Sequence, residues 1–79
     1  MKNKNNQSPT VKFGKRIKKL RNARSISQEK LAELASVHRT YIGMIERGEK
    51  NITMLSMLKL ANALEITLSD LFEDFEDGK

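Results

Sequence analysis

The residues of this sequence best suited to a specific binding contact lie on a short helical segment that begins near Arg39 and Thr40. The planar guanidinium of an arginine matches the O6 and N7 acceptors of guanine, and such a bidentate contact discriminates between bases by roughly 1–3 kcal/mol. A threonine can hydrogen-bond a base through its hydroxyl or pack its methyl on a thymine methyl. Met44, one turn later on the same face, could add an apolar contact. Gly43 costs a helix interior about 1 kcal/mol relative to alanine, and we expect it to let the helix backbone approach DNA bases closely, beside these three side chains.

The spacing from Gln28 to Arg47 is that of a helix-turn-helix, which would hold this run outward. Ala32 is the small residue needed where the first helix passes close to the second. Ser36 and Val37 supply the turn, and Ile42 points back between the helices, as does Ile45. The turn position of Ser36 is usually glycine in this motif, so we expect a positive φ there at a modest steric cost.

A second group of polar residues around the motif is expected to contact phosphates. Gln28 opens the first motif helix, where its side chain and the free backbone N–H groups suit a phosphate oxygen. His38, a lone histidine at the mouth of the second helix, is expected to be a cap or a phosphate contact and not a metal ligand. Tyr41 is expected to fill core space with its ring and to reach a phosphate with its hydroxyl. The full set expected at phosphates is Ser27, Gln28, Arg21, His38, Tyr41, Arg47, Lys50 and Asn51.

Charge is distributed unevenly along the 79 residues, whose formal net charge is +5. Residues 1–24 contain nine basic side chains and no acidic one, whereas residues 65–79 contain six acidic side chains and one lysine. Such polarity gives a positive end that favours a polyanionic partner and a negative end that faces away from it. The alternative is that these charges are only solvated faces.

Helical periodicity predicts that these residues are positioned by a compact all-α bundle of five short helices. Thr10, Ser27, Thr53 and Thr67 are expected helix caps, and Asp70 is placed for a capping box with Thr67. The first helix is expected to end near Arg24 and the third to run from about His38 to Arg47, with Gly48 in a left-handed position. The positions expected to be apolar stripes are Phe13, Ile17, Leu20, Leu31, Leu34, Ala35, Leu55, Leu58, Ala61, Leu64, Leu68, Leu71 and Phe72. Residues 1–9 are expected to be a disordered polar tail, residues 10–75 the domain, and residues 76–79 an acidic tail.

The chain resembles the helix-turn-helix domain of the phage repressor and Cro family (the xenobiotic-response-element type) from Val11 to Phe72. The matching elements are Leu20-Arg21, Ser27-Gln28, Leu31-Ala32, Tyr41-Ile42, Ile45-Glu46-Arg47-Gly48, Leu60-Ala61, Ala63-Leu64 and Leu71-Phe72. Within that family, residues 39–42 and 45–47 are similar to the controller proteins of restriction–modification systems. The resemblance implies a lambda-repressor-like DNA-binding domain, and a homodimeric transcriptional regulator acting on its own operator. The alternatives are a phage-type or chromosomal repressor, and an antitoxin or adaptor module that mainly binds protein.

The resemblance also implies roles for individual residues. In that family the residue matching Gln28 contacts a phosphate, and the position of Lys50 is often basic and in contact with DNA. The residues matching Arg21 and Glu46 form an ion pair that ties the first helix to the end of the reading helix. We therefore expect a structural ion pair between Arg21 and Glu46, with Arg21 able to spare a donor for phosphate.

The C-terminal part of the sequence has more apolar surface than one small helical domain can easily cover. We expect a dimer interface that includes Met57, Ile66, Phe72 and Phe75. A two-fold interface there would set two reading helices about 34 Å apart, which matches the half-sites of a palindromic operator.

Other classes of function are not expected. One histidine, no cysteine, no glycine-rich phosphate loop and no evident carboxylate pair make catalysis, a metal site or a cofactor improbable. Without an attached sensor domain no small-molecule ligand is expected. No apolar run approaches the roughly 20 residues of a membrane span, so we expect no membrane partner and a cytoplasmic protein.

Overall fold

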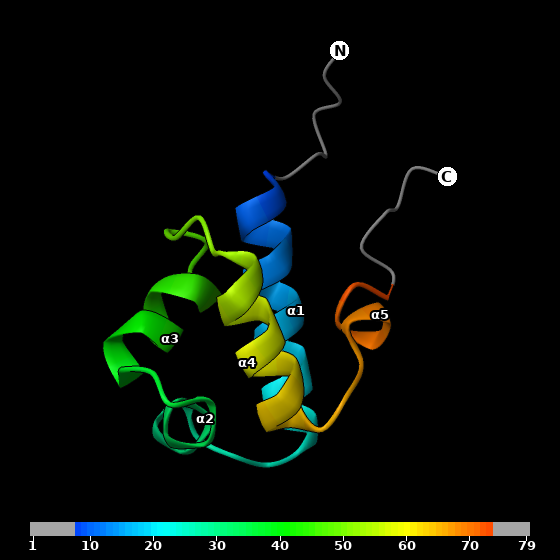
Figure 1. The fold of residues 1–79 in the computed structure, drawn as a ribbon. Helices are drawn as coiled ribbons and strands as arrows, with labels where there is room; N and C mark the ends of the chain where they lie inside the picture. The colour runs from blue at the N-terminus through cyan, green and yellow to red at the C-terminus, as the bar shows by residue number, and fades with distance from the viewer. Residues whose placement is uncertain (1–7, 74–79) are drawn as a thin grey trace.

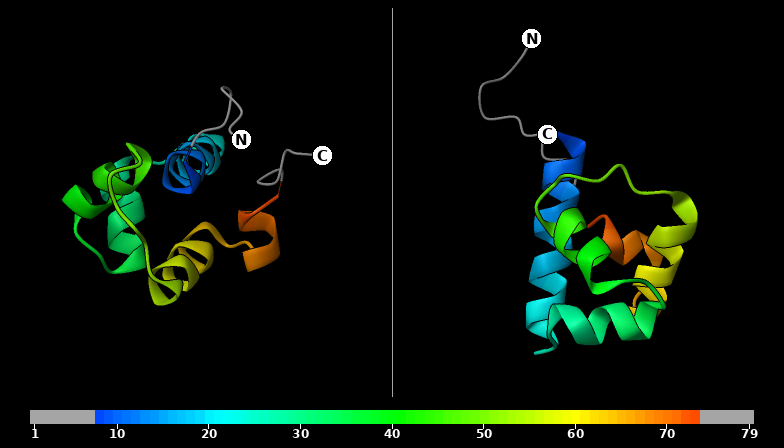
Figure 2. Two further views of the ribbon diagram at one scale, coloured as in Figure 1. Left: turned by 90° about the horizontal axis from the view of Figure 1, so that it is seen from above. Right: turned by 90° about the vertical axis from the view of Figure 1, so that its left-hand side faces the viewer.

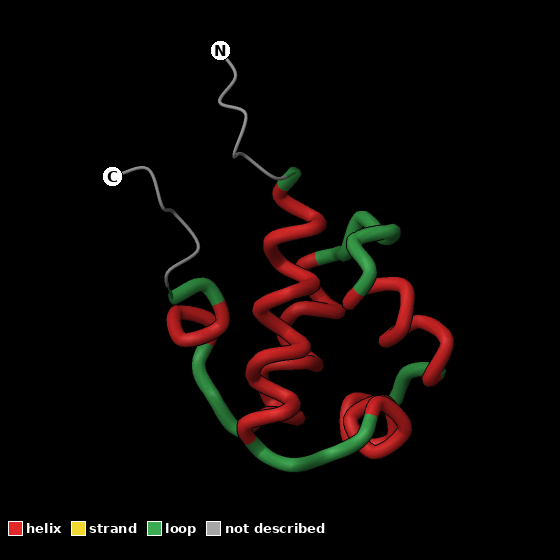
Figure 3. The backbone as a smooth tube through the Cα atoms, turned by 180° about the vertical axis from the view of Figure 1, so that it is seen from behind, coloured by secondary structure: helices red, strands yellow, loops and turns green. Residues whose placement is uncertain are grey.

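The structure, a computed structural model, describes residues 8–73 and confirms the predicted all-α fold of five helices. These are α1 (Pro9–Ala23), α2 (Gln28–Ala35), α3 (Arg39–Glu46), α4 (Met54–Leu64) and α5 (Leu68–Leu71), with no strand in this range. α3 lies against both α1 and α2, and α4 lies against α2 (Figure 1). α2 lies across the end from which the chain leaves α1 (Figure 2). From behind, α1 separates α5 from the α2–α3 pair (Figure 3). No described helix has both the length and the apolar character needed to cross a bilayer.

Hydroxyl caps begin most of these helices, as the sequence predicts. The side chains of Ser27, Thr53 and Thr67 each accept a hydrogen bond from the backbone N–H three residues later. Such caps satisfy N–H groups that have no partner within the helix, and each is worth about 1 kcal/mol. The carboxylate of Asp70 also accepts from the Thr67 N–H at 3.2 Å, which completes the expected capping box.

Two predicted helix starts are corrected by the structure. α1 is capped by Ser8 and not by Thr10, because Ser8 Oγ accepts from the Val11 N–H at 3.3 Å and Pro9 occupies the first turn. The fixed φ of proline and its missing N–H suit that position, so the helix begins ahead of the predicted residue. α3 begins at Arg39, with His38 as its N-cap residue, but the His38 side chain makes no capping hydrogen bond.

The turn between α2 and α3 has the expected left-handed residue. Ser36 has a φ of 59°, and the Val37 N–H donates to the Ala32 carbonyl at 3.0 Å across the turn. A residue with a Cβ is strained in this region of backbone conformation. Ser36 nevertheless adopts the left-handed conformation, so the turn of the motif forms without the usual glycine.

The core confirms most of the predicted apolar positions and corrects three of them. Leu34, Leu55 and Leu58 are exposed, with 48%, 63% and 42% of their surface accessible, whereas Leu60 is buried. The sequence of α4 is apolar on nearly every side, so helical periodicity alone does not select its inner face. The buried apolar residues are Phe13, Ile17, Leu31, Ala32, Ala35, Ile42, Ile45, Leu60, Ala61, Ala63, Leu64 and Leu71.

Arg16 of α1 and Arg24, the C-cap residue of that helix, hold the C-terminal ends of α5 and α4. Arg16 donates to the carbonyls of Asp70 and Leu71 at 2.6 and 3.3 Å, and Arg24 donates to the Leu64 carbonyl at 3.1 Å. Guanidinium groups suit these positions because the last carbonyls of a helix lack partners and carry partial negative charge. Part of the positive charge of the first 24 residues therefore stabilises the fold and does not face an external polyanion.

Candidate nucleic-acid interface

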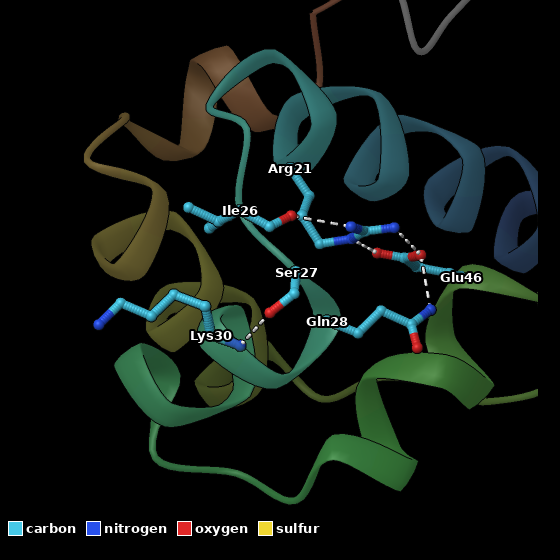
Figure 4. A network of polar contacts seen from close by, with 6 residues as sticks. All are labelled: Arg21, Ile26, Ser27, Gln28, Lys30 and Glu46. Atoms are coloured by element: carbon cyan, nitrogen blue, oxygen red, sulfur yellow. Dashed lines mark hydrogen bonds and ion pairs between the residues drawn. The ribbon is translucent and has the colours of Figure 1, made fainter.

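Glu46, the last residue of α3, joins three helices through its carboxylate (Figure 4). Arg21 of α1 donates to it from Nε at 2.7 Å and from Nη2 at 3.1 Å. Gln28, the first residue of α2, donates from Nε2 at 3.0 Å. Arg21 Nη1 also donates to the carbonyl of Ile26, in the segment between α1 and α2, at 2.9 Å. The end of α3 is thereby fixed to α1 and α2, and Arg21 also binds the segment that connects those two helices.

The two charged side chains of this network are largely buried. The Glu46 side chain is 3% exposed and that of Arg21 is 11% exposed. The hydrogen bonds from Arg21 to Glu46, together with the charge of the carboxylate, raise the pKa of the Arg21 guanidinium above its usual value. The ion pair that the resemblance implies is present in the structure.

The same geometry does not favour the expected contact of Arg21 with a phosphate. All three guanidinium nitrogens of Arg21 already donate to protein oxygens, and the side chain points inward. Because a mostly buried guanidinium in this position would have to leave its carboxylate to reach DNA, we assign Arg21 to the scaffold.

The outer face of α3 presents the residues expected at base edges. Arg39 and Thr40 are exposed in the first turn of the helix, and Met44 is half-buried one turn later. Arg39 Nε lies 3.8 Å from a carboxylate oxygen of Glu29 on α2, and both side chains are largely exposed. Ion pairs of this kind are worth at most about 1 kcal/mol, so Arg39 is available to an external partner.

Gly43 differs from its expected role. It is buried, and a Cβ built on it would lie 3.2 Å from Arg47 Nη1 and 3.8 Å from Gln28 Oε1. The space left by the missing side chain is therefore bordered by Arg47 and Gln28, so bare backbone is not presented to solvent at this point. A Cβ at position 43 would make an ordinary contact with Gln28 and a tight contact with the flexible end of Arg47, which would have to shift slightly. The burial of Gly43 does not favour the expected direct base contact.

The remaining candidates for phosphate contact lie at the start of α2 and around the end of α3. The Ser27 hydroxyl accepts from the Lys30 N–H at 2.9 Å, and the Tyr41 hydroxyl is 3.1 Å from the hydroxyl of Ser56 on α4. Lys50 Nζ lies 5.9 Å from the centre of the Tyr41 ring. The candidates whose side chains are exposed are Ser27, His38, Arg47, Lys50 and Asn51, whereas Gln28 and Tyr41 are half-buried.

Two functional positions were missed from the sequence. A Cβ on Gly14 of α1 would collide with the backbone carbonyls of Ile45 and Glu46, so this glycine lets α1 pack directly on the end of α3. Glycine in a helix interior is an available signal for such close approach. Glu49 is the second, because its carboxylate binds the guanidinium of Arg47 at 3.0 and 3.1 Å. The only feature of the sequence that could have indicated a role for Glu49 is its negative charge next to residues expected to contact phosphates.

The residues expected at a dimer interface are placed mainly against the core. Met57, Ile66 and Phe72 are half-buried and pack on it, and the Phe72 ring centroid is 5.6 Å from that of Phe13. Phe75 lies outside the described residues. The exposed large apolar side chains are instead Leu34 on α2 and Met54, Leu55 and Leu58 on α4. Residues 8–73 contain no group of three or more acidic, histidine or cysteine side chains able to hold a metal ion.

The fold and this face define the class of the protein. A helix-turn-helix family model matches residues 17–71, and the chain is a DNA-binding regulator of that family with no enzymatic activity. More narrowly, the chain belongs to the control proteins of restriction–modification systems. It is 40% identical over 67 residues to the control protein C.MunI of a Mycoplasma species, covering 84% of this chain and 90% of that one. It is also 40% identical over 62 residues to the control protein C.BamHI of Bacillus amyloliquefaciens, covering 77% and 76%.

A solved structure agrees with this assignment. The restriction–modification controller protein C.AhdI of Aeromonas hydrophila superposes with a TM-score of 0.81 at 45% identity, covering 84% of this chain and all of that chain. The predicted family resemblance and fold are both confirmed.

Proposed function

We propose that this chain acts as a homodimer on a palindromic operator beside its own gene, in the cytoplasm, with α3 of each protomer in the major groove. The observation that carries the proposal is the exposure of Arg39 and Thr40 on the outer face of a helix whose far end is fixed through Glu46. Base recognition requires side chains that reach outward from a rigidly placed helix, and the first turn of a recognition helix is the part that enters the groove. The relatives that are named as controller proteins support the regulatory role.

In this proposal Arg39 reads a guanine, and Thr40 and Met44 contact neighbouring bases. Gln28, Ser27, His38, Arg47, Lys50 and Asn51 surround this reading face and bind phosphates on either side of the groove. Tyr41 has its hydroxyl at hydrogen-bonding distance from Ser56, so its main contribution is to hold α3 on α4. A phosphate contact would use the remaining hydrogen-bonding capacity of the same hydroxyl.

The exposed face of α4 supports the homodimer. Met54, Leu55 and Leu58 lie on one outer side of that helix and are 70%, 63% and 42% exposed. Contiguous exposed apolar side chains of this kind mark interaction surfaces. A second copy of this chain is the occupant we propose, because a two-fold contact brings identical apolar faces together and also doubles the number of reading helices. We therefore place the interface on this face of α4 and not on the half-buried residues Met57, Ile66 and Phe72.

Substitution of Arg39 tests the proposed function. Bound sequences would first be selected from a random DNA pool at a stated salt concentration, and Arg39→Ala would then be compared with the wild type on the selected site and on a random duplex. We expect affinity for the selected site to fall by roughly 10- to 100-fold, as the loss of a bidentate guanine contact implies. Affinity for the random duplex should fall much less.

Arg39→Lys and Lys30→Ala are the matched controls for this measurement. Arg39→Lys keeps the charge but lacks the planar fork, so it should lose most of the same specificity. Lys30→Ala removes an exposed cation elsewhere on the motif and should leave the base preference unchanged. If Arg39→Ala retains full preference for the selected site, or if the wild type binds all duplexes equally, the proposed base reading is wrong and a protein-binding adaptor role is favoured.

A further inference from the structure

The guanidinium of Arg47 is occupied within the protein by a carboxylate. Nε of Arg47 donates to one oxygen of Glu49 at 3.0 Å and Nη2 donates to the other at 3.1 Å. This is the two-point geometry by which an arginine also binds a phosphate. The pair differs from the contact of Arg39 with Glu29, which is a single 3.8 Å ion pair.

The backbone at the end of α3 fixes this pair. The Gly48 N–H donates to the Ile45 carbonyl at 3.0 Å, and the Glu49 N–H donates to the Met44 carbonyl at 2.9 Å. Gly48 has a φ of 78°. Together these features form a Schellman motif, which turns the chain back over the last turn of the helix. Glu49 is therefore held beside Arg47 by the way the helix ends, and a long flexible loop is not involved.

Arg47 also lies close to the start of α2. Its Nη1 atom and the Oε1 atom of Gln28 both lie near the point where a Cβ of Gly43 would be. Gln28 is the first residue of α2, whose N-terminal N–H groups suit a phosphate oxygen. Arg47 thus stands next to the proposed phosphate site of Gln28, with its donor edge already bound to Glu49.

We propose that Glu49 is a built-in competitor for DNA, whose carboxylate takes the place of a backbone phosphate on Arg47 and is displaced when DNA binds. This inference rests on the proposed function and adds a residue that limits affinity at the same face. The side chains of Arg47 and Glu49 are 58% and 51% exposed, so the exchange of partners needs no rearrangement of the core.

The physical reason is that a carboxylate and a phosphate compete for one donor edge. While Glu49 is bound, the Nε–H and one N–H of Nη2 are not available to DNA, so Arg47 cannot bind a phosphate through this two-donor edge. The negative charge of Glu49 also repels an approaching phosphate. Arg47 lowers the pKa of the Glu49 carboxyl from its usual value, first through its hydrogen bonds. The competitor consequently stays charged throughout the neutral pH range. An amide at position 49 would free the guanidinium and remove the repulsion.

The substitution Glu49→Gln tests the proposal. We expect the variant to bind DNA about two- to fivefold more tightly than the wild type at low salt, because an exposed ion pair is worth at most about 1 kcal/mol. The slope of log K against log salt concentration should stay nearly unchanged, because Arg47 neutralises the same phosphate in both complexes once Glu49 has been displaced. Binding would be measured by fluorescence anisotropy on a random duplex and on a selected site. Both duplexes report on a phosphate contact, since such contacts carry no sequence information.

Two comparisons distinguish the effect of the changed net charge from the effect of freeing the Arg47 guanidinium. Glu33→Gln makes the same change in net charge at an exposed residue of α2 and should change affinity by less than about twofold. In an Arg47→Met background, Glu49→Gln should gain less than it does in the wild type, because only the removal of repulsion is left. The proposal is overturned if Glu49→Gln binds equally or more weakly, or if its gain is undiminished without Arg47.

Failure of this proposal can be told apart from failure of the proposed function. A normal loss of specificity in Arg39→Ala, together with an unchanged affinity in Glu49→Gln, overturns the competitor alone. Absence of any sequence preference in the wild type overturns the proposed base reading, and the random duplex still shows whether Glu49 competes for Arg47.

Discussion

At the scale of single residues, one buried carboxylate fixes the end of α3 and thereby the position of its outer face. Glu46 accepts hydrogen bonds from Arg21 and Gln28, which come from two other helices. Each partner has been removed from water, and the loss of one leaves the others without compensation. The ion pair therefore matters more for the position of α3 than for net stability.

Glu46→Ala should lower the free energy of unfolding by about 3 kcal/mol, because it leaves the Arg21 guanidinium buried and unpaired. DNA affinity should fall, but the preferred bases should stay the same, since Glu46 itself points away from the groove. Urea denaturation and selection from a random DNA pool would measure the two effects. A changed base preference would show that Glu46 takes part in recognition and is not only structural.

At the scale of elements, two helical glycines have opposite roles. Gly14 lies where α1 meets the carbonyls at the end of α3, and the obstacle to a side chain there is backbone. At Gly43 the nearest obstacle is the flexible end of the Arg47 side chain. The first glycine is required for packing, whereas a side chain at the second would only displace the end of Arg47.

Alanine substitutions at these two glycines should consequently change stability in opposite directions. Gly14→Ala should destabilise the domain by about 3 kcal/mol, because α1 and α3 must move apart. Gly43→Ala should stabilise it by about 0.5–1 kcal/mol, the usual gain for alanine in a helix interior, while displacing Arg47 and altering DNA affinity. Chemical denaturation of both variants measures the change in stability, and fluorescence anisotropy measures the change in DNA affinity. Equal destabilisation by both substitutions would contradict this distinction.

At the scale of the whole molecule, some charged and apolar side chains stabilise the fold, and others are exposed to solvent. Arg16 and Arg24 bind the C-terminal carbonyls of α5 and α4, so these cations hold the bundle together. Lys15, Lys18 and Lys19 of the same helix remain exposed. The outer side of α4 leaves apolar side chains in solvent, which a second copy would cover.

Leu55→Asn combined with Leu58→Asn should convert the proposed dimer to a monomer. Both side chains are exposed in the protomer, so the folded protomer should persist, while operator affinity falls because one reading helix is lost per complex. Sedimentation velocity at tens of micromolar would report the mass. Leu34→Asn, at an exposed leucine of α2, is the control and should leave the mass unchanged. A monomeric wild type at that concentration would contradict the proposed dimer.

The sequence by itself determined the five helices, the hydroxyl caps of three of them and the family. Ser27, Thr53 and Thr67 act on N–H groups three residues away, and the turn at Ser36 depends on neighbours in the chain, so local pattern was sufficient. Local pattern also placed Arg39 and Thr40 at the start of a helix with an outward face. The start of α1 was predicted wrongly because two hydroxyl residues, Ser8 and Thr10, compete for one cap.

Only the tertiary structure decided which side chains are already engaged. Arg16 and Arg24 look like other cations in the sequence, and their carbonyl partners lie 40 to 55 residues away along the chain. The inner face of α4 and the role of Gly43 likewise depend on what packs against them. Hydrogen-bond partners and burial are set by distances in space between segments far apart in the chain, and helical periodicity within one segment carries no information about those distances.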